Sequence, residues 1–328
     1  MSVQTLKDYS TLFVNIPDSR LSEGVVFSVT HQRYYWIDVF KGIIFSAKED
    51  LTDLKHITVT QKFGSFSERV GCVIPSKEDA DVVYFGGKYG LAKANIDTSN
   101  WEYICLYSAS SLNRDWDRMR SNDGNSDPND SSVIYIGIMN DFSVGEVTLE
   151  GAVMKFTIGQ SITCECVYDG IRIPNSINFI GKEQIYLTDS LNFQILEIPY
   201  GSKDWKRDAV MKIDIKAGNK EFEYPEPDGS FIFDNRYFVT AVWSTSKIQI
   251  YDLFDSKLLY EYIISGAERI SCCCLAAKDN KVIVSTAALD FDSTEKSDND
   301  LNGALFEIQL QDLVPSPESF LKDGKTHI

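Results

Sequence analysis

The chain has 328 residues, of which 48 are acidic and 32 basic, so its formal net charge is −16. Its 43% hydrophobic and 12% aromatic residues are typical of a soluble globular protein with a large core. The acidic balance disfavours nucleic acid and anionic membrane surfaces as partners, because it repels their phosphate groups.

The chain also lacks the signals of a membrane or secreted protein. No segment approaches the roughly 20 consecutive apolar residues of a membrane span, and the N-terminal segment has no basic flank and apolar stretch of a signal peptide. Seven cysteines, three of them adjacent at Cys272 to Cys274, favour a reducing compartment where they remain thiols. We therefore expect a cytoplasmic protein.

One sequence pattern recurs six times along the chain. Each copy joins a short run of β-branched and aromatic residues to a polar turn and a second run with two-residue alternation, which predicts a β-hairpin. The copies start 45 to 52 residues apart, at Tyr34 (YYWIDVFKGIIFSA), Val83 (VYFGGKYGLAKANI), Val133 (VIYIGIMND), Ile185 (IYLTDSLNFQILEI), Tyr237 (YFVTAVWSTSKIQIYD) and Val282 (VIVSTAALD).

A repeat of this length with about four short strands is typical of a propeller blade. The sequence therefore predicts an all-β fold, a six-bladed β-propeller with four-stranded antiparallel blades. We expect the N-terminal segment 11–16 to close the ring by completing the last blade, since closure leaves little exposed sheet edge. Residues 1–328 then form a single domain with an ordered core over about 11–312 and an irregular tail over 313–328.

Two polar segments interrupt the pattern. Residues 121–132 (SNDGNSDPNDSS) read as a turn-rich loop inserted in the third repeat, and residues 290–303 (DFDSTEKSDNDLNG) read as an acidic loop in the last hairpin. Both are too polar for a core, so we expect both to be solvated loops.

A polar residue precedes the first apolar run in most repeats. In a propeller this position lies near the central axis. The residues there are Glu23, Asn122, Asn175, Asp228 and Ser271, whereas the second repeat offers only Gly71. Carboxylate and carboxamide oxygens suit calcium, magnesium or manganese. In the alternative interpretation, these residues only initiate turns, as Asp and Asn do in many all-β proteins.

Motifs in these repeats resemble those of a known family. They are Ser22-Glu23-Gly24, Arg120 to Gly124 followed by Asp127-Pro128, Pro174-Asn175-Ser176, Tyr186 to Ser190, Pro227-Asp228-Gly229 and Ser271-Cys272-Cys273. Together, and in this order from about Leu21 to Ile308, they are similar to the family of regucalcin (senescence marker protein), gluconolactonase and luciferin-regenerating enzyme.

The resemblance implies a six-bladed propeller that holds one divalent cation (calcium, zinc, magnesium or manganese) in its channel and hydrolyses sugar lactones. It implies Glu23, Asn175 and Asp228 as metal ligands, and Arg120 and Asn122 as residues that bind the substrate. Asp228 is also the natural general base for an attacking water. The chain departs from the family pattern in having Ser176 after Asn175. Near Met139, where a substrate-contacting acid can occur, either Asp141 or Phe142 shapes the pocket.

The predicted function is that of a metal-dependent lactonase with a small-molecule lactone substrate. Two alternatives stay open: a metal-dependent hydrolase of another ester or an organophosphate, and a non-catalytic calcium-binding propeller. The sequence carries no signal for the oligomeric state.

Overall fold

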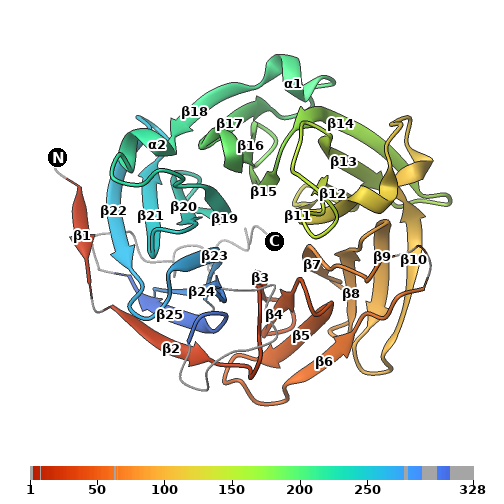
Figure 1. Cartoon of the computed structure of the whole chain (residues 1–328), viewed down its shortest axis with the longest axis horizontal. Coiled ribbons are helices and arrows are strands. Elements are labelled where there is room, and N and C mark those ends of the chain that lie inside the picture. Colours follow the sequence, from red (N-terminus) through yellow and green to blue (C-terminus); the bar gives the residue numbers. More distant parts are fainter. Residues whose placement is uncertain are drawn as a thin grey trace.

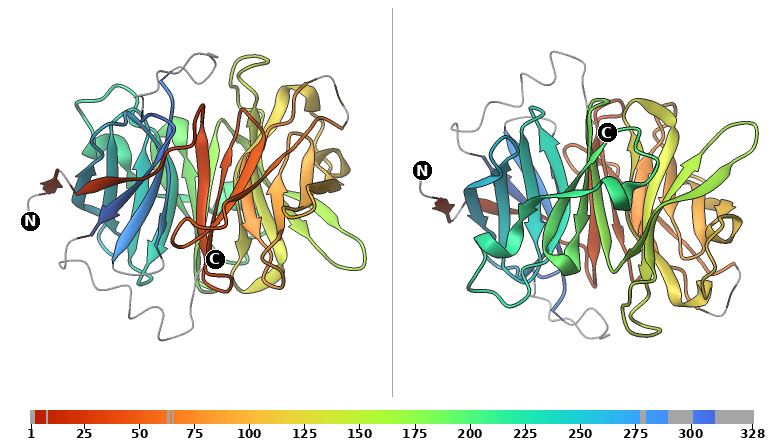
Figure 2. Two further views of the ribbon diagram at one scale, coloured as in Figure 1. Left: turned by 90° about the horizontal axis from the view of Figure 1, so that it is seen from below. Right: turned by 90° about the horizontal axis from the view of Figure 1, so that it is seen from above.

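The computed structural model describes residues 3–7, 9–62, 64, 66–276, 280–289 and 301–310. Its strands form six antiparallel sheets arranged as blades around a central axis (Figure 1). Seen from the side, the strands run between the two faces of the ring (Figure 2). The predicted all-β, six-bladed propeller is confirmed.

We number the blades in chain order. Blade 1 contains β3 (Ser22–Ser28), β4 (Arg33–Asp38), β5 (Ile43–Lys48) and β6 (Lys55–Thr58). Blade 2 contains β7 (Cys72–Pro75), β8 (Val82–Gly86), β9 (Gly90–Asn95) and β10 (Asn100–Leu106). Blade 3 contains β11 (Met119–Asp127), β12 (Asp130–Asn140), β13 (Gly151–Thr157) and β14 (Thr163–Ile171).

The other three blades follow the same plan. Blade 4 contains β15 (Pro174–Ile180), β16 (Gln184–Asp189), β17 (Gln194–Pro199) and β18 (Val210–Asp214). Blade 5 contains β19 (Pro227–Phe233), β20 (Tyr237–Val242), β21 (Lys247–Asp252) and β22 (Lys257–Ile263). Blade 6 contains β23 (Arg269–Leu275), β24 (Lys281–Ala287) and β25 (Leu305–Gln309).

Short helical turns lie in the connections between strands. They are η1 (Tyr107–Ala109), η2 (Trp116–Arg118), η3 (Ser190–Asn192), α1 (Trp205–Asp208) and α2 (Ile215–Gly218). None of the described helices has the length and apolar character needed to span a membrane.

The six predicted hairpins are the middle strands of the blades, and their composition follows from their position. All six residues of β4 are buried, because neighbouring blades cover both faces of the sheet. Tyr35 and Ile37 pack in the core that blade 1 shares with blade 2, and Trp36 packs in the core shared with blade 6. A strand covered on both sides has a nearly continuous apolar run. The two charged residues at the ends of β4 are buried with hydrogen-bond partners: Arg33 donates to the Ser46 hydroxyl, and Asp38 accepts from the Arg20 N–H.

The N-terminal segment closes the ring as expected. β2 (Ser10–Val14) pairs antiparallel with β25 and becomes the outer strand of blade 6. The preceding strand, β1 (Gln4–Leu6), pairs parallel with β22 and adds a fifth strand to blade 5 (Figure 1). β1 and β2 therefore lie at the outer edges of two adjacent blades.

The prediction of a solvated loop over residues 121–132 is wrong. β11 and β12 cover almost this whole segment and leave only a short turn at residues 128–129. The segment is polar because β11 lines the central channel, where polar side chains find partners: the Ser121 hydroxyl donates to the Gly86 carbonyl at 2.7 Å. Most of the predicted acidic loop and the whole predicted tail lie outside the described residues.

Candidate functional site

A β-bulge interrupts five of the six innermost strands at the same level. One extra residue enters β3 between Glu23 and Val26, β11 between Ser121 and Gly124, and β19 between Pro227 and Ser230. β15 and β23 have equivalent shifts after Pro174 and Ile270. A bulge locally bends a strand and redirects its side chains. The bulges therefore bring the predicted polar residues to the channel from within the strands, and not from the turns before them.

The innermost strand of blade 2 differs because the neighbouring backbone comes very close. β7 pairs with β8 without a shift, and Gly71 stands just before it. A Cβ atom on Gly71 would lie 2.5 Å from the Ser121 carbonyl carbon. Only glycine fits there, which explains why the second repeat offers no polar side chain.

Asn175 and Asp228 are in direct contact across blades 4 and 5. The Asn175 Nδ2 donates a hydrogen bond to Asp228 Oδ1 and a second one to the Ser190 hydroxyl at 3.3 Å. That hydroxyl donates to the Pro227 carbonyl at 2.7 Å, which ties the two bulges together. In blade 1, Glu23 Oε2 accepts a hydrogen bond from the Gly24 N–H at 2.8 Å.

Arg120 and Asn122 occupy the adjoining wall in blade 3. The Arg120 Nη1 donates to the Ser121 carbonyl at 2.7 Å and to Asn122 Oδ1 at 3.2 Å. The Asn122 Nδ2 donates to the Pro174 carbonyl of blade 4 at 3.2 Å. The buried Nε of Arg120 has no hydrogen-bond partner among the described residues, so this guanidinium retains a donor for a ligand.

The carboxylates in the channel disfavour one another's charge. Glu23 and Asp228 are half-buried. Desolvation, and secondly the charge of Asp123, raise the pKa of Glu23 to about 8. Desolvation, and secondly the charge of Glu23, raise the pKa of Asp228 well above its usual value. Desolvation lowers the pKa of Arg120 to about 10, so it remains a cation at neutral pH.

Asp123 is a third channel carboxylate that sequence reasoning did not select. Desolvation raises its pKa to about 6, and its negative charge raises the pKa of both Glu23 and Asp228. In a regular strand, side chains alternate between the two faces, so Asn122 and Asp123 would point apart. The bulge in β11 places both residues at the channel, and no pattern in the sequence indicates the bulge.

A buried ion pair lies next to Arg120. Lys88, in the turn between β8 and β9, donates to Asp141 Oδ2 at 3.1 Å, and both side chains are at most 1% exposed. The Arg120 guanidinium packs against the Phe142 ring, with its carbon 5.1 Å from the ring centre. Asp141 and Phe142 therefore both shape the surroundings of Arg120. The sequence analysis did not select Lys88, because a lysine in a glycine-rich segment such as Gly86 to Gly90 is typical of an exposed turn.

The three residues predicted as metal ligands offer a suitable donor set for a hard divalent cation. They supply two carboxylates and one carboxamide oxygen, which are hard oxygen ligands. The positive charge of the Arg120 guanidinium lowers the pKa of Glu23, but desolvation raises it more. Within the described part of the chain, no group of three or more Asp, Glu, His and Cys side chains is arranged to hold a metal ion. The predicted set contains two such side chains, Glu23 and Asp228, and the carboxamide of Asn175 is its third member.

Comparison with known proteins gives the family. The model described as SMP-30/Gluconolactonase/LRE-like region matches residues 21–288. The chain belongs to this family. An uncharacterized protein of Saccharomyces cerevisiae is 33% identical over 329 residues, covering 89% of this chain and 88% of that protein.

Solved structures of the SMP-30/gluconolactonase family share the fold. Regucalcin of Agrobacterium tumefaciens, described as a calcium-binding protein, superposes with a TM-score of 0.71 at 18% identity and covers 94% of this chain and 95% of its own. A gluconolactonase of Xanthomonas campestris superposes with a TM-score of 0.63 at 12% identity, covering 89% and 87%. At these identities the likeness establishes the propeller architecture alone.

Proposed function

We propose that this protein is a divalent-metal-dependent hydrolase that opens small lactones, with sugar lactones as its substrate class. Glu23, Asn175 and Asp228 would hold the cation, and Arg120 and Asn122 would bind the substrate. One observation carries the proposal: Glu23 and Asp228 reach the channel from different blades, and desolvation together with like charge raises the pKa of both. A bound cation would relieve both penalties.

The residues of the chain divide the chemistry among them. When bound, the cation supplies Lewis-acid polarisation of the lactone carbonyl and acidifies water. Asp228 would accept the proton from the attacking water, since a carboxylate that holds the cation with one oxygen keeps its second oxygen as a proton acceptor. Arg120 would stabilise the negative charge that develops on the carbonyl oxygen, using its Nε, which has no hydrogen-bond partner among the described residues. The Asn122 amide would orient a substrate oxygen.

Hydrolysis by metal-depleted and metal-supplied protein tests the proposal. Purified protein is treated with a chelator and then supplied separately with calcium, magnesium, manganese or zinc. We expect the metal-free protein to be inactive, and at least one cation to restore opening of glucono-1,5-lactone. No opening of any aldonolactone above background with any cation would overturn the proposal, and hydrolysis of a phosphotriester alone would favour the organophosphate alternative.

A pair of variants separates catalysis from passive cation binding. Asp228→Asn should abolish lactone opening while the protein remains folded, because the amide cannot accept the proton. Asp255→Asn is the matched control in the same blade, since Asp255 pairs with Lys257 on the outer surface. If wild type and Asp228→Asn open lactones equally, the channel is not the catalytic site. Cation binding without lactone opening by either protein would instead favour the calcium-binding alternative, which the regucalcin neighbour suggests.

A further inference from the structure

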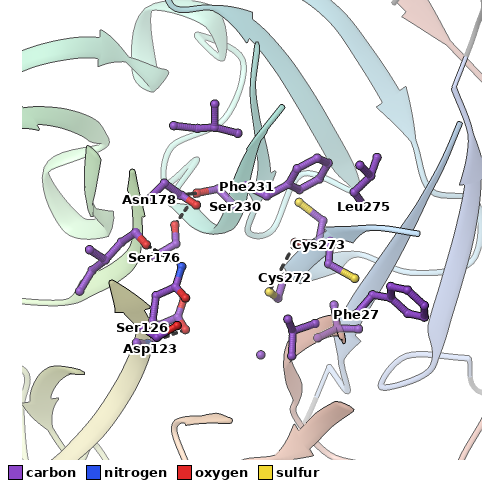
Figure 3. Close-up of a pocket in the computed structure, with 18 of the residues that line it drawn as sticks. Phe27, Asp123, Ser126, Ser176, Asn178, Ser230, Phe231, Cys272, Cys273 and Leu275 are labelled. Carbon is purple, nitrogen blue, oxygen red and sulfur yellow. Dashed lines mark hydrogen bonds between the residues drawn. The ribbon is translucent and has the colours of Figure 1, made fainter. Parts of the chain in front are cut away.

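Beyond the proposed metal ligands, the channel continues as a cavity of about 180 Å³. Its lining residues follow the bulges along the innermost strands, and blade 2 adds Val73. They are Gly24 to Phe27 and Val29 of blade 1, Asp123 to Ser126 and Pro128 of blade 3, residues 176–179 of blade 4, residues 230–233 of blade 5 and residues 272–276 of blade 6. Arg120, Lys88 and Asp141 are not among them. We call this cavity the distal chamber, and Figure 3 shows its walls.

The distal chamber has two chemically different sides (Figure 3). Blades 3, 4 and 5 contribute polar side chains to one side: Asp123, Asn125, Ser126, Ser176, Asn178 and Ser230. The opposite side comes from blades 1 and 6 together with Phe231 of blade 5, and it contains Phe27, Cys272, Cys273, Cys274 and Leu275. Desolvation raises the pKa of the Cys272 and Cys274 thiols well above the usual value, so both remain neutral. This side is therefore apolar and uncharged.

The polar side has hydrogen-bonding capacity that the described residues of the protein do not use. The Asn125 Nδ2 donates to the Ile177 carbonyl at 3.0 Å, and the Asn178 Nδ2 donates to the Ser230 hydroxyl at 2.8 Å. These bonds fix the orientation of both amides and leave their oxygens as acceptors. No side-chain hydrogen bond of Ser126 is found within the described part of the chain, although this residue is only 6% exposed.

We propose that the distal chamber is a second binding site, which takes a small uncharged amphipathic molecule with one hydroxyl group and a short alkyl body. The hydroxyl would donate to an amide oxygen on the polar side, and the alkyl body would pack against Phe27 and the cysteines. An apolar cavity of about 150 Å³ can hold one benzene molecule, so the chamber of about 180 Å³ has room for a ligand with a short alkyl body. Asp123 borders both the chamber and the proposed metal site, so its carboxylate would repel an anionic ligand.

Hexan-1-ol is a suitable probe, and glycerol is its contrast because it has a similar size but no alkyl body. Both are titrated into the full chain, and binding is followed by ligand-observed NMR. Hexan-1-ol should bind at least 10-fold more tightly than glycerol. It should bind equally well to chelator-treated protein, so a failure of the lactonase proposal would leave this result unaffected.

Two variants place the binding in the chamber. Ser126→Leu fills the space and should weaken hexan-1-ol binding at least 10-fold, whereas Ser161→Leu, an exposed serine of the same blade, should leave it unchanged. Asn178→Leu keeps the size of the side chain but removes the acceptor, and should weaken binding about fivefold. If hexan-1-ol does not bind, or if it binds Ser126→Leu as tightly as wild type, the chamber is only a water-filled part of the channel.

Discussion

At the scale of single residues, the Lys88–Asp141 pair is the sharpest electrostatic feature next to the channel. Both side chains are buried, so removing one partner leaves the other charge uncompensated. Asp141→Asn should therefore lower the free energy of unfolding by about 3–5 kcal/mol, measured by urea denaturation. Asp255→Asn removes an exposed ion pair and should cost no more than about 1 kcal/mol. Equal losses of stability in the two variants would contradict the interpretation that Lys88 and Asp141 compensate each other's buried charge.

The Asp141 carboxylate also predicts how the stability of the protein depends on pH. Desolvation is the largest influence on Asp141 and raises its pKa, but the Ser143 hydroxyl and the charges of Lys88, Arg120 and Arg69 outweigh it, so the pKa lies below its usual value. The ionised Asp141 therefore stabilises the folded state. Its contribution is complete above the pKa of an aspartate in the unfolded chain, about 3.9, and is lost as the pH falls through the lower pKa of Asp141 in the folded chain.

The stability difference between wild type and Asp141→Asn should therefore stay constant from pH 7 to about 5 and shrink below about pH 4. Urea denaturation across this range measures it. A difference that grows on acidification would mean that Asp141 is protonated more readily in the folded state, contrary to its surroundings.

The level in the ring of residues next to apolar runs could be placed from the sequence, whereas a side-chain direction set by a bulge, or burial that depends on a distant partner, could not. Glu23, Asn175 and Asp228 precede strong strand signals, so their level in the ring followed from the repeat. Asp123 follows another polar residue, and its direction depends on the bulge. Lys88 is buried because of Asp141, which lies 53 residues further along the chain.

At the scale of elements, the N-terminal strands have separable roles. β2 completes blade 6, and Phe13 packs edge-on against Tyr34 of blade 1 with ring centres 5.3 Å apart. Removing residues 1–14 would leave β25 as an open edge and uncover part of the blade 6 core. The deletion should cost about 2–4 kcal/mol, the burial energy of one or two apolar side chains, and should promote aggregation through the exposed edge.

A shorter deletion is the control. Removing residues 1–7 takes away β1 but keeps β2, so blade 6 stays closed and blade 5 keeps its own four strands. Thermal unfolding and size-exclusion chromatography should show a smaller loss of stability and no aggregation. If both deletions behave alike, the closure by β2 contributes little.

The middle hairpins were predictable and one inner strand was not, because the two kinds of strand have different surroundings. Middle strands are covered by neighbouring blades on both sides and are therefore almost entirely apolar. β11 faces a polar channel over much of its length, so its sequence resembles that of a surface loop. Polarity distinguishes water-contacting residues from covered residues, but it does not distinguish a channel wall from a turn.

At the scale of the whole molecule, the proposed ligands belong to blades 1, 4 and 5, which are not all adjacent. A cation bound to all three would stabilise the closed ring and not a single blade. Binding to the folded chain alone stabilises it by about 2.7 kcal/mol when the free cation is at 100 times its dissociation constant. The stabilisation by the bound cation should exceed that from general screening of the net charge of −16, which any other cation would provide equally.

Thermal unfolding with and without the cation tests this coupling. The cation that restores activity should raise the melting temperature of wild type by several degrees, and a chelator should reverse the rise. Glu23→Gln and Asp228→Asn should lose the shift, since each removes one charged ligand, while Asp255→Asn should retain it. If all variants respond equally, the cation acts at the acidic surface, and the three blades are not joined through their shared axis.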